Sequence, residues 1–346
     1  MRPSHRLPAS FLALALALTL SSLTAVNAQE EKPRKSSIQS KANTVPMKTF
    51  GGRQFWGDLY YFHEWRIQQN VLTKHHRLLD GEDVRHHSGT YEECREKLDE
   101  IRKEQKLPAM KGKAVVLVHG IVRSSKSFSA MEKKLKAEGY SVFAFDYPST
   151  RVSIPESAEY LRKSIKSLEG IDEIYLVVHS MGGLVVRSML VKGQDPRIKR
   201  MVMMGVPNMG AEMADTFKKN PLFKVIFGPA GQQLVTDGEG LISELPTPKF
   251  EFAILAGARG TEKGYNPLIP GDDDGTVAVS STRLPGANDF ISKPVLHSFL
   301  MFNKECIEHT SRYLKTGKFR EKEPAQPIEV APQQQIEQKP KPDEKK

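Results

Sequence analysis

The sequence predicts an α/β fold built on a mostly parallel β-sheet with helices on both of its faces. From residue 111 onward, short apolar segments alternate with segments of helical periodicity. Alternation of this kind is typical of βαβ units, whose strands are covered on both faces and are therefore apolar throughout. The candidate strands are residues 114–118, 141–145, 174–178, 200–204, 250–255 and 294–296.

Helical periodicity fills the intervals between these strands. Residues 128–139 place apolar side chains on one face and end at Gly139, which suits the C-terminal cap of a helix. Residues 153–168 begin with Ser153 and Glu156 at the spacing of a capping box, and their apolar residues then recur at intervals of three and four. These segments predict helices that cover the sheet.

The composition excludes several other classes of protein. The chain of 346 residues is 39% hydrophobic and 27% charged, which is too apolar for a wholly disordered protein. Its two cysteines, Cys94 and Cys306, cannot build a disulfide-dense scaffold or a zinc site of four thiolates. The pairs His75–His76 and His86–His87 have no carboxylate at a familiar ligand spacing, so we expect no metal.

The first 28 residues are expected to form a Sec signal peptide. Arg2 and Arg6 precede the apolar run 11–20, and small residues lead up to Ala28. A buried helix or a retained anchor is the alternative, but the apolar run is shorter than the ~20 residues that a spanning helix needs. We therefore expect cleavage after Ala28 and an exported protein, either periplasmic or extracellular.

The rest of the chain divides by composition. Residues 29–45 are polar and predict a linker, and residues 46–110 predict an N-terminal helical extension because their aromatic residues recur at helical spacing. Residues 111–317 form the α/β domain. Residues 318–346 are rich in proline, glutamine and charged residues, which predicts a disordered tail.

The net charge is +10, and +8 remains after the expected removal of residues 1–28, which suggests an anionic partner. Lipid headgroups or envelope polymers would be attracted to such a protein, and a solvated basic surface without a partner is the alternative. The sequence contains no helix-turn-helix, RNA-binding or finger motif, so no nucleic acid is expected.

The segment 174–183 has the pattern of a nucleophile elbow. An apolar strand leads directly into Ser180, and a helix is expected to begin at about Gly182. Such a turn lifts the serine hydroxyl above the sheet and directs the free N–H groups of the helix toward it. The usual pattern is Gly-x-Ser-x-Gly, and Val178 replaces the first glycine here. A strand–turn–helix with an incidental serine is the alternative interpretation.

A serine nucleophile needs a base and an orienting acid, which follow it in the order acid, then histidine. His297 follows a candidate strand and can reach back from a loop, whereas His309 lies within a charged helical segment and is expected at the surface. The acid is expected after the strand 250–255, where Asp272, Asp273 and Asp274 all qualify. A Ca²⁺ loop is a competing interpretation of the aspartates, although their spacing differs from that of an EF-hand.

An acyl-transfer intermediate also requires two N–H donors for its oxyanion. The N–H of Met181, directly after the nucleophile, is the first candidate. The second donor should come from the loop after the first strand, where we select Ile121 over Val122. His119 is expected to support this loop.

Together, these motifs resemble the α/β-hydrolases, and among them the lipase-like set that includes triacylglycerol lipases and GPI inositol-deacylase-like proteins. The resemblance covers residues 111–317. It implies the α/β-hydrolase fold, a triad of Ser180, Asp274 and His297, and ester hydrolysis through an acyl-serine without a cofactor. The matching motifs are Val118-His119-Gly120, residues 178–183, Gly205-Val206-Pro207-Asn208-Met209-Gly210, Asp274-Gly275-Thr276-Val277 and His297.

Residues 210–249 form an insertion that is either a lid or an apolar face packed on the core. A lid would place Phe217 and Phe223, together with Met209, against the acyl chain of an ester or lipid substrate. Two other functions remain open. An acyltransferase or thioesterase would use the same triad, and a catalytically silent module would bind the envelope through its basic surface.

Overall fold

The computed structural model describes residues 47–48, 52–210, 228–234 and 240–330. The predicted signal peptide, the predicted linker, Phe217, Phe223 and most of the predicted lid lie outside the described residues. Within the described part of the chain, no helix combines the length and the hydropathy that a membrane crossing requires.

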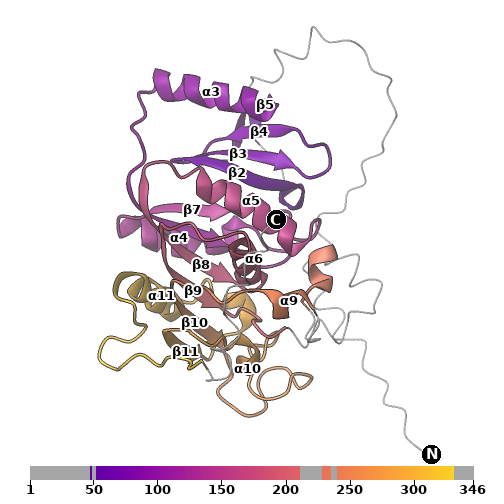
Figure 1. Ribbon diagram of the computed structural model, residues 1–346, viewed down its shortest axis with the longest axis vertical. Helices are drawn as coiled ribbons and strands as arrows, with labels where there is room; N and C mark the ends of the chain where they lie inside the picture. The colour runs from indigo at the N-terminus through magenta and orange to yellow at the C-terminus, as the bar shows by residue number, and fades with distance from the viewer. Residues whose placement is uncertain (1–46, 49–51, 211–227, 235–239, 331–346) are drawn as a thin grey trace, which may run out of the picture. The chain divides into compact units, whose positions relative to one another are not determined.

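The main domain contains a six-stranded parallel sheet in the order β11-β10-β9-β8-β6-β7 (Figure 1). The predicted parallel sheet is therefore confirmed. The predicted strand at 294–296 is wrong, because the last strand lies earlier and Val295 already turns back to donate to the Lys293 carbonyl. The strands are β6 (Gly112–Val118), β7 (Ser141–Phe145), β8 (Ile171–His179), β9 (Ile198–Met204), β10 (Glu251–Gly257) and β11 (Asp289–Lys293).

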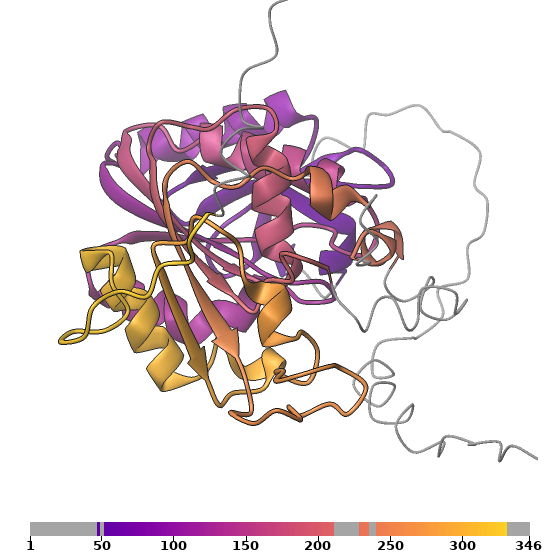
Figure 2. The same cartoon turned by 60° about the horizontal axis from the view of Figure 1, so that its bottom comes forward.

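Helices cover both faces of this sheet, as Figures 1 and 2 show. Alternate residues of each strand contribute to two separate apolar cores, so that Val116 of β6 belongs to one core and Val115 to the other. Helices α5 (Ile154–Lys166) and α6 (Met181–Leu190) supply the first core. Helices α4 (Ser129–Ala137) and α11 (Lys304–Thr316) supply the second. Two short helices, α9 (Leu241–Glu244) and α10 (Val279–Thr282), lie in the connections around β10.

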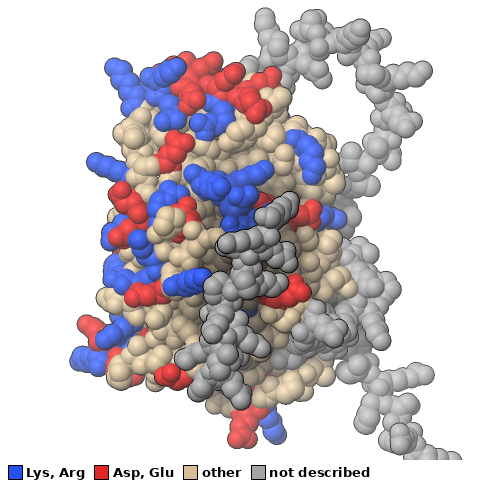
Figure 3. All heavy atoms as spheres, viewed as in Figure 1, with Lys and Arg blue, Asp and Glu red and all other residues tan. Residues whose placement is uncertain are grey.

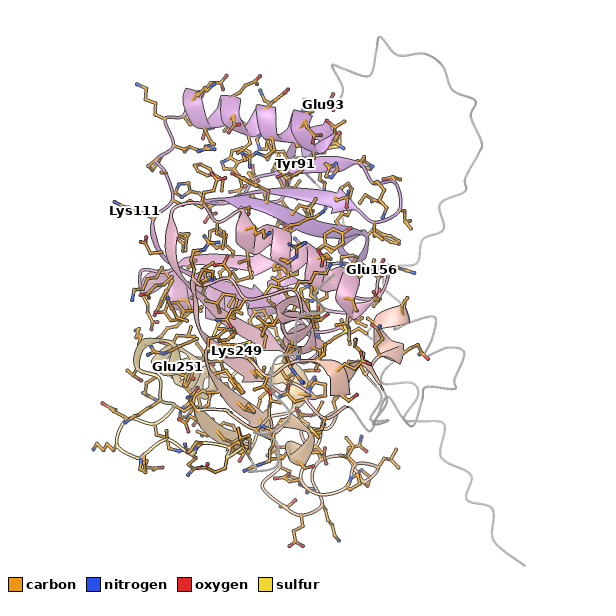
Figure 4. All side chains as sticks on the ribbon, viewed as in Figure 1. Tyr91, Glu93, Lys111, Glu156, Lys249 and Glu251 are labelled. Atoms are coloured by element: carbon orange, nitrogen blue, oxygen red, sulfur yellow. The ribbon has the colours of Figure 1, made fainter. Side chains whose placement is uncertain are left out.

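The predicted helix ends in this domain are confirmed. Ser153 and Glu156 form a complete capping box at the beginning of α5, where Figure 4 labels Glu156. Gly139 lies just after the end of α4 and has a φ of +91°, a left-handed conformation that glycine adopts without steric cost.

The prediction of a helical N-terminal extension is wrong. The region folds into a five-stranded antiparallel sheet in the order β1-β5-β4-β3-β2, and α3 (Tyr91–Glu104) is its one long helix among the described residues. A capping box begins α3, and Figure 4 labels its Glu93. The strands are β1 (Met47–Lys48), β2 (Trp56–Phe62), β3 (Trp65–Asn70), β4 (His76–Leu79) and β5 (Val84–Gly89), and a short 3-10 turn, η2 (Arg53–Phe55), precedes β2.

The error has a physical cause in the burial of β2. Residues Gly57–Phe62 of this strand are all buried, and four consecutive members of this run, residues 59–62, are apolar and do not alternate with polar residues. A short apolar run of this kind cannot be distinguished from a buried helix by periodicity alone. One face of β2 packs on α5 so closely that a Cβ added at Gly57 would lie 2.5 Å from Cδ1 of Tyr160.

The prediction of a disordered tail is wrong for residues 318–330. Phe319 is fully buried, and its N–H donates to Oδ2 of Asp289 at 2.8 Å. Farther along, Ile328 exchanges backbone hydrogen bonds with Gly286 and Ala287. A single buried carboxylate and one aromatic side chain thus anchor a segment whose average composition suggests disorder. Residues 331–346 lie outside the described part of the chain.

Candidate active site

The turn between β8 and α6 has the strained backbone of a nucleophile elbow. Ser180 separates the last residue of β8, His179, from the first residue of α6, Met181, and has a φ of +54°. Positive φ is uncommon for residues with a side chain and persists only where the surroundings enforce it. Here the N–H of Ser180 donates to the Met204 carbonyl at 3.0 Å, which ties the turn to the end of β9.

Glycines allow the surrounding backbones to approach this turn. A Cβ at Gly182 would lie 2.5 Å from the Val118 carbonyl oxygen, and a Cβ at Gly120 would lie 2.8 Å from Cβ of Ser180. The side chain of Val178 lies elsewhere, in the apolar core shared with α5 and α6. The replacement of the usual first glycine by Val178 therefore leaves the elbow intact, because the close contacts occur on the helix side of the turn.

The structure brings Ser180, His297 and Asp274 together in one chain of hydrogen bonds. His297 Nε2 lies 3.0 Å from Ser180 Oγ, and His297 Nδ1 lies 2.7 Å from Asp274 Oδ2. The first residue of the short 3-10 turn η4 (His297–Phe299) is His297 itself, whose N–H also donates to the Asp274 carbonyl at 2.9 Å. With an imidazole proton on Nδ1, Nε2 is free to accept the proton of the serine hydroxyl.

The loop after β10 holds the Asp274 carboxylate in this orientation. Its Oδ1 accepts the N–H groups of Thr276 and Val277 at 3.0 and 2.8 Å, which leaves Oδ2 directed at the imidazole. Asp274 fits against the end of β10 because residue 257 is a glycine, since a Cβ at Gly257 would lie 2.6 Å from Cβ of Asp274. The carboxylate is thus fixed before any substrate binds.

The other candidate acids shape the same loop and do not contact His297. Asp273 accepts the N–H groups of Asn266 and Gly275, and Asp272 accepts those of Arg259 and Gly260. His309 lies on α11, where its Nδ1 is 2.8 Å from the Phe319 carbonyl oxygen. The described residues contain no cluster of three or more potential metal ligands.

The oxyanion donors expected from the sequence belong to the beginning of α6 and to the loop after β6. Met181 is the first residue of α6, where an N–H has no partner within the helix. In the loop after β6, the N–H of Val122 donates to Ser149 Oγ at 3.1 Å and is therefore occupied. This occupation favours Ile121, rather than Val122, as the second donor.

Two buried histidines flank the nucleophile from the ends of β6 and β8. His119 stacks on Tyr147 at a centroid distance of 4.3 Å and places its Nδ1 2.8 Å from the Gly120 carbonyl oxygen. His179 places its Nε2 3.0 Å from the carbonyl oxygen of His297. Burial lowers the pKa of both imidazoles, and the neighbouring His297 lowers the pKa of His179 further. Both side chains therefore support the surrounding loops as neutral groups at neutral pH.

The described loops that follow the carboxyl-terminal ends of the strands expose several large apolar side chains. Met209, one of the predicted substrate contacts, is 61% exposed in the loop after β9. Leu296 and Phe299 are exposed on either side of His297. The full set also includes Val122, Tyr265, Leu268 and Phe302.

Sequence reasoning missed the polar residues that support the loop after β6. Arg123 donates to Ser298 Oγ at 2.7 Å and so joins this loop to the residue after His297, although the two are 175 positions apart. Gln54 of the N-terminal extension donates to the Arg123 carbonyl at 2.9 Å. A single sequence carries no signal for such pairs, because each partner is an ordinary polar residue in its own segment.

Residues 82–240 match the model of a family described as a domain of unknown function, DUF7379. A search of curated proteins finds no match to this sequence. Among solved structures, the chain is similar to the mature form of the lipase BlEst2 from Bacillus licheniformis, with 22% identity, a TM-score of 0.42, and coverage of 56% of this chain and 87% of that one.

Two further solved structures show a likeness of the same degree. The lin2722 product of Listeria innocua has 18% identity and a TM-score of 0.44, with coverage of 64% of this chain and 99% of that one. An extracellular α/β-hydrolase from a Paenibacillus species has 18% identity and a TM-score of 0.40, with coverage of 60% and 98%. The α/β-hydrolase fold predicted from the sequence is confirmed by the chain's own sheet, with Ser180 at its elbow.

Proposed function

We propose that this α/β-hydrolase is a serine hydrolase that cleaves carboxylic esters through an acyl-serine intermediate. One observation carries the proposal, namely the continuous hydrogen-bond chain from Ser180 Oγ through His297 to Asp274. A serine hydroxyl is a weak nucleophile by itself, and an adjacent imidazole held by a carboxylate is the arrangement that activates it.

In the first half of the reaction, Ser180 Oγ attacks the ester carbonyl carbon while its proton passes to Nε2 of His297. Asp274 stabilises the resulting imidazolium through Nδ1–H. The N–H groups of Met181 and Ile121 stabilise the oxyanion of the tetrahedral intermediate. Collapse of this intermediate breaks the bond to the alkoxide, which takes the proton from His297 and leaves as the alcohol.

In the second half, water attacks the acyl-serine carbonyl carbon and gives its proton to His297. The second tetrahedral intermediate collapses to the free acid, and Ser180 recovers its proton. No cofactor takes part in either half. An alcohol in place of water would give acyl transfer, so the products formed in the presence of a competing alcohol separate an esterase from an acyltransferase.

The exposed apolar side chains around the site support an ester with an apolar acyl group, such as a lipid. Met209 lies in the loop after β9, and Leu296 and Phe299 lie at the two ends of the turn that contains His297. Contacts of the acyl chain with Phe217 and Phe223 stay a prediction, since both residues lie outside the described part of the chain.

Export from the cytosol remains part of the proposal on the evidence of residues 1–28. An anionic membrane or envelope surface is a further proposed partner, supported by the net charge of +8 that remains of the +10 after residues 1–28 are removed. On the face that Figure 3 shows, acidic and basic side chains of the described residues are interspersed. Any attraction to such a surface would therefore be diffuse over this face.

Labelling and turnover together test the proposal. The protein and its Ser180→Ala variant are treated with a fluorophosphonate and assayed on p-nitrophenyl esters of increasing chain length. We expect Ser180→Ala to lose labelling and to lose turnover by roughly 10⁴-fold or more. Ser188→Ala is the matched control, since Ser188 lies on α6, the helix that begins directly after Ser180, and is 8% exposed, as Ser180 is. Equal labelling of the wild type and Ser180→Ala would exclude Ser180 as the nucleophile.

A further inference from the structure

We propose that Gln54, in the N-terminal extension, is a positioning residue that holds the oxyanion loop in its active conformation. The oxyanion loop is defined here as residues 119–123. The inference rests on the proposed function, because the loop needs a defined shape only if Ser180 generates an oxyanion. It also gives the N-terminal extension a role in catalysis. The extension lies outside residues 111–317, the part of the chain that resembles the α/β-hydrolases.

The side-chain amide of Gln54 joins three segments of the chain. Its Nε2 donates to the Arg123 carbonyl at 2.9 Å, directly within the oxyanion loop. Its Oε1 accepts the hydroxyls of Ser149 and Thr150 at 3.0 and 3.1 Å. Both hydroxyl residues are buried and follow the end of β7. One amide therefore bonds through its donor to the oxyanion loop and through its acceptor to the loop after β7.

A second hydrogen bond extends this support to the residue beside Ile121. Ser149 donates its only hydroxyl proton to Gln54, so the lone pairs of Oγ are free to accept the N–H of Val122 at 3.1 Å. Val122 has a φ of +59°, which is exceptional for a β-branched residue. This backbone conformation persists only where neighbouring groups enforce it, and the bonds through Ser149 and Arg123 are placed to do so.

Arg53, the residue before Gln54, holds the segment that directly follows the oxyanion loop. Arg53 donates to Ser125 Oγ at 3.1 Å and forms an ion pair with Asp146, which also accepts the N–H of Ser125 at 2.8 Å. The turn η2 thus supports the oxyanion loop through Gln54 and the beginning of the next turn, η3 (Ser125–Phe128), through Arg53. Gln54 is the better residue to test, since it is uncharged and its replacement leaves the ion pairs in place.

The extension also supplies a matched control. Gln69 of β3 is half-buried, as is Gln54, and its Oε1 accepts the hydroxyl of Tyr160 on α5 at 3.2 Å. Both glutamines therefore bond the extension to the main domain through a side-chain amide. Only Gln54 bonds to the oxyanion loop, so a comparison of the two separates loop positioning from general attachment of the extension.

The experiment compares Gln54→Met with Gln69→Met in the full-length protein. We measure kcat and KM for a p-nitrophenyl ester, the inhibition constant of a trifluoromethyl ketone that forms a hemiketal with Ser180, and the melting temperature. For Gln54→Met we expect a fall in kcat of about tenfold with little change in KM, smaller than the ~10²–10³-fold loss of a donor itself. The ketone should bind more weakly by a similar factor. Gln69→Met should retain the wild-type kcat.

Two further variants test the relay through Ser149. Ser149→Ala removes the acceptor for the Val122 N–H and should also lower kcat, and the double variant Gln54→Met/Ser149→Ala should lose less than the product of the two single losses. Gln54→Glu keeps the acceptor for Ser149 but places an acceptor-only carboxylate oxygen against the Arg123 carbonyl oxygen, so its kcat should fall at least as far as that of Gln54→Met. The Ser149 variants keep the inference testable if Gln54→Met fails to fold.

The outcomes distinguish this inference from the proposed function. Wild-type kcat and ketone affinity in Gln54→Met, or equal losses of kcat in Gln54→Met and Gln69→Met, would overturn the positioning role while Ser180→Ala remains inactive. Full activity in Ser180→Ala would overturn the proposed function itself. Fully multiplicative losses in the double variant would reject the relay through Ser149.

Discussion

Two buried carboxylates that follow the carboxyl-terminal ends of parallel strands have contrasting partners. Asp274 follows β10, and Asp146 follows β7, and both are 1% exposed. Asp274 bonds to the imidazole of His297. Asp146 forms ion pairs with the guanidinium groups of Arg53 and Arg66. His119 Nε2 also lies 3.8 Å from Oδ1 of Asp146, beyond hydrogen-bond distance. The same side chain at the same depth is therefore hydrogen-bonded to an imidazole in one place and to a guanidinium in the other.

The partner determines what each carboxylate can do. An imidazole nitrogen can accept a proton from a hydroxyl and return it, so the pair with Asp274 is suited to proton transfer. Guanidinium stays protonated, so the pair with Asp146 can only hold charge and geometry. Burial by itself would raise the pKa of Asp146, but Arg66 and Arg53 outweigh it and hold the pKa below its usual value. Asp146 is thus an anchor that attaches the N-terminal extension to the main domain.

The largest expected effect concerns Asp274. In Asp274→Asn the amide cannot stabilise the imidazolium, and kcat should fall by about 10⁴-fold while the melting temperature changes little. Steady-state kinetics and thermal unfolding of the purified variant measure both quantities. Asp272→Asn is the control, since Asp272 accepts backbone N–H groups and does not contact His297. Nearly full activity in Asp274→Asn would assign the orienting role to another group.

Asp146→Asn should lower the stability of the protein more than its kcat, the reverse of Asp274→Asn. The substitution leaves Arg53 and Arg66 without one of their buried acceptors, and breaking a buried pair of this kind costs about 3 kcal/mol. We expect this loss in the free energy of unfolding, measured by urea denaturation, with a smaller relative effect on kcat than that of Asp274→Asn. An unchanged free energy of unfolding would show that Asp146 does not anchor the extension.

The smallest effect is a dependence of stability on pH. Burial lowers the pKa values of His119 and His179, so the unfolded chain takes up protons on these residues at a higher pH than the folded chain. The free energy of unfolding should therefore fall as the pH drops below about 6.5, by at most ~1.4 kcal/mol per pH unit for each histidine. Asp146 adds a second loss below about pH 4, where its lowered pKa makes its protonation favour the unfolded chain.

Urea unfolding at a series of pH values between 7.5 and 4.5 measures the loss of stability assigned to His119 and His179. His119→Phe keeps the stacking on Tyr147 and removes one titrating group, so it should flatten the slope of stability against pH. An identical slope in the wild type and the variant would contradict the assignment of the effect to His119.

Much of the main domain could be predicted from the sequence because its signals are local. The apolar strands, the capping box at Ser153 and the turn at Gly139 each depend on residues a few positions apart. The extension was predicted wrongly because β2 is buried on both faces, which removes the alternation that identifies a strand. The segment 318–330 was predicted wrongly because Asp289 and Phe319, 30 positions apart, order it through a contact that composition does not record.

The sequence by itself determined the parallel sheet, the order of nucleophile, acid and histidine, and the elbow at Ser180. These depend on periodicity and on turn chemistry, which act over short stretches of chain. The resemblance to the α/β-hydrolases already indicated Asp274 among three adjacent aspartates. Only the tertiary structure shows its carboxylate bonded to the imidazole, with Oδ2 lying 2.7 Å from His297 Nδ1. It likewise brought Gln54 to the oxyanion loop, because contacts between distant segments arise when their elements pack.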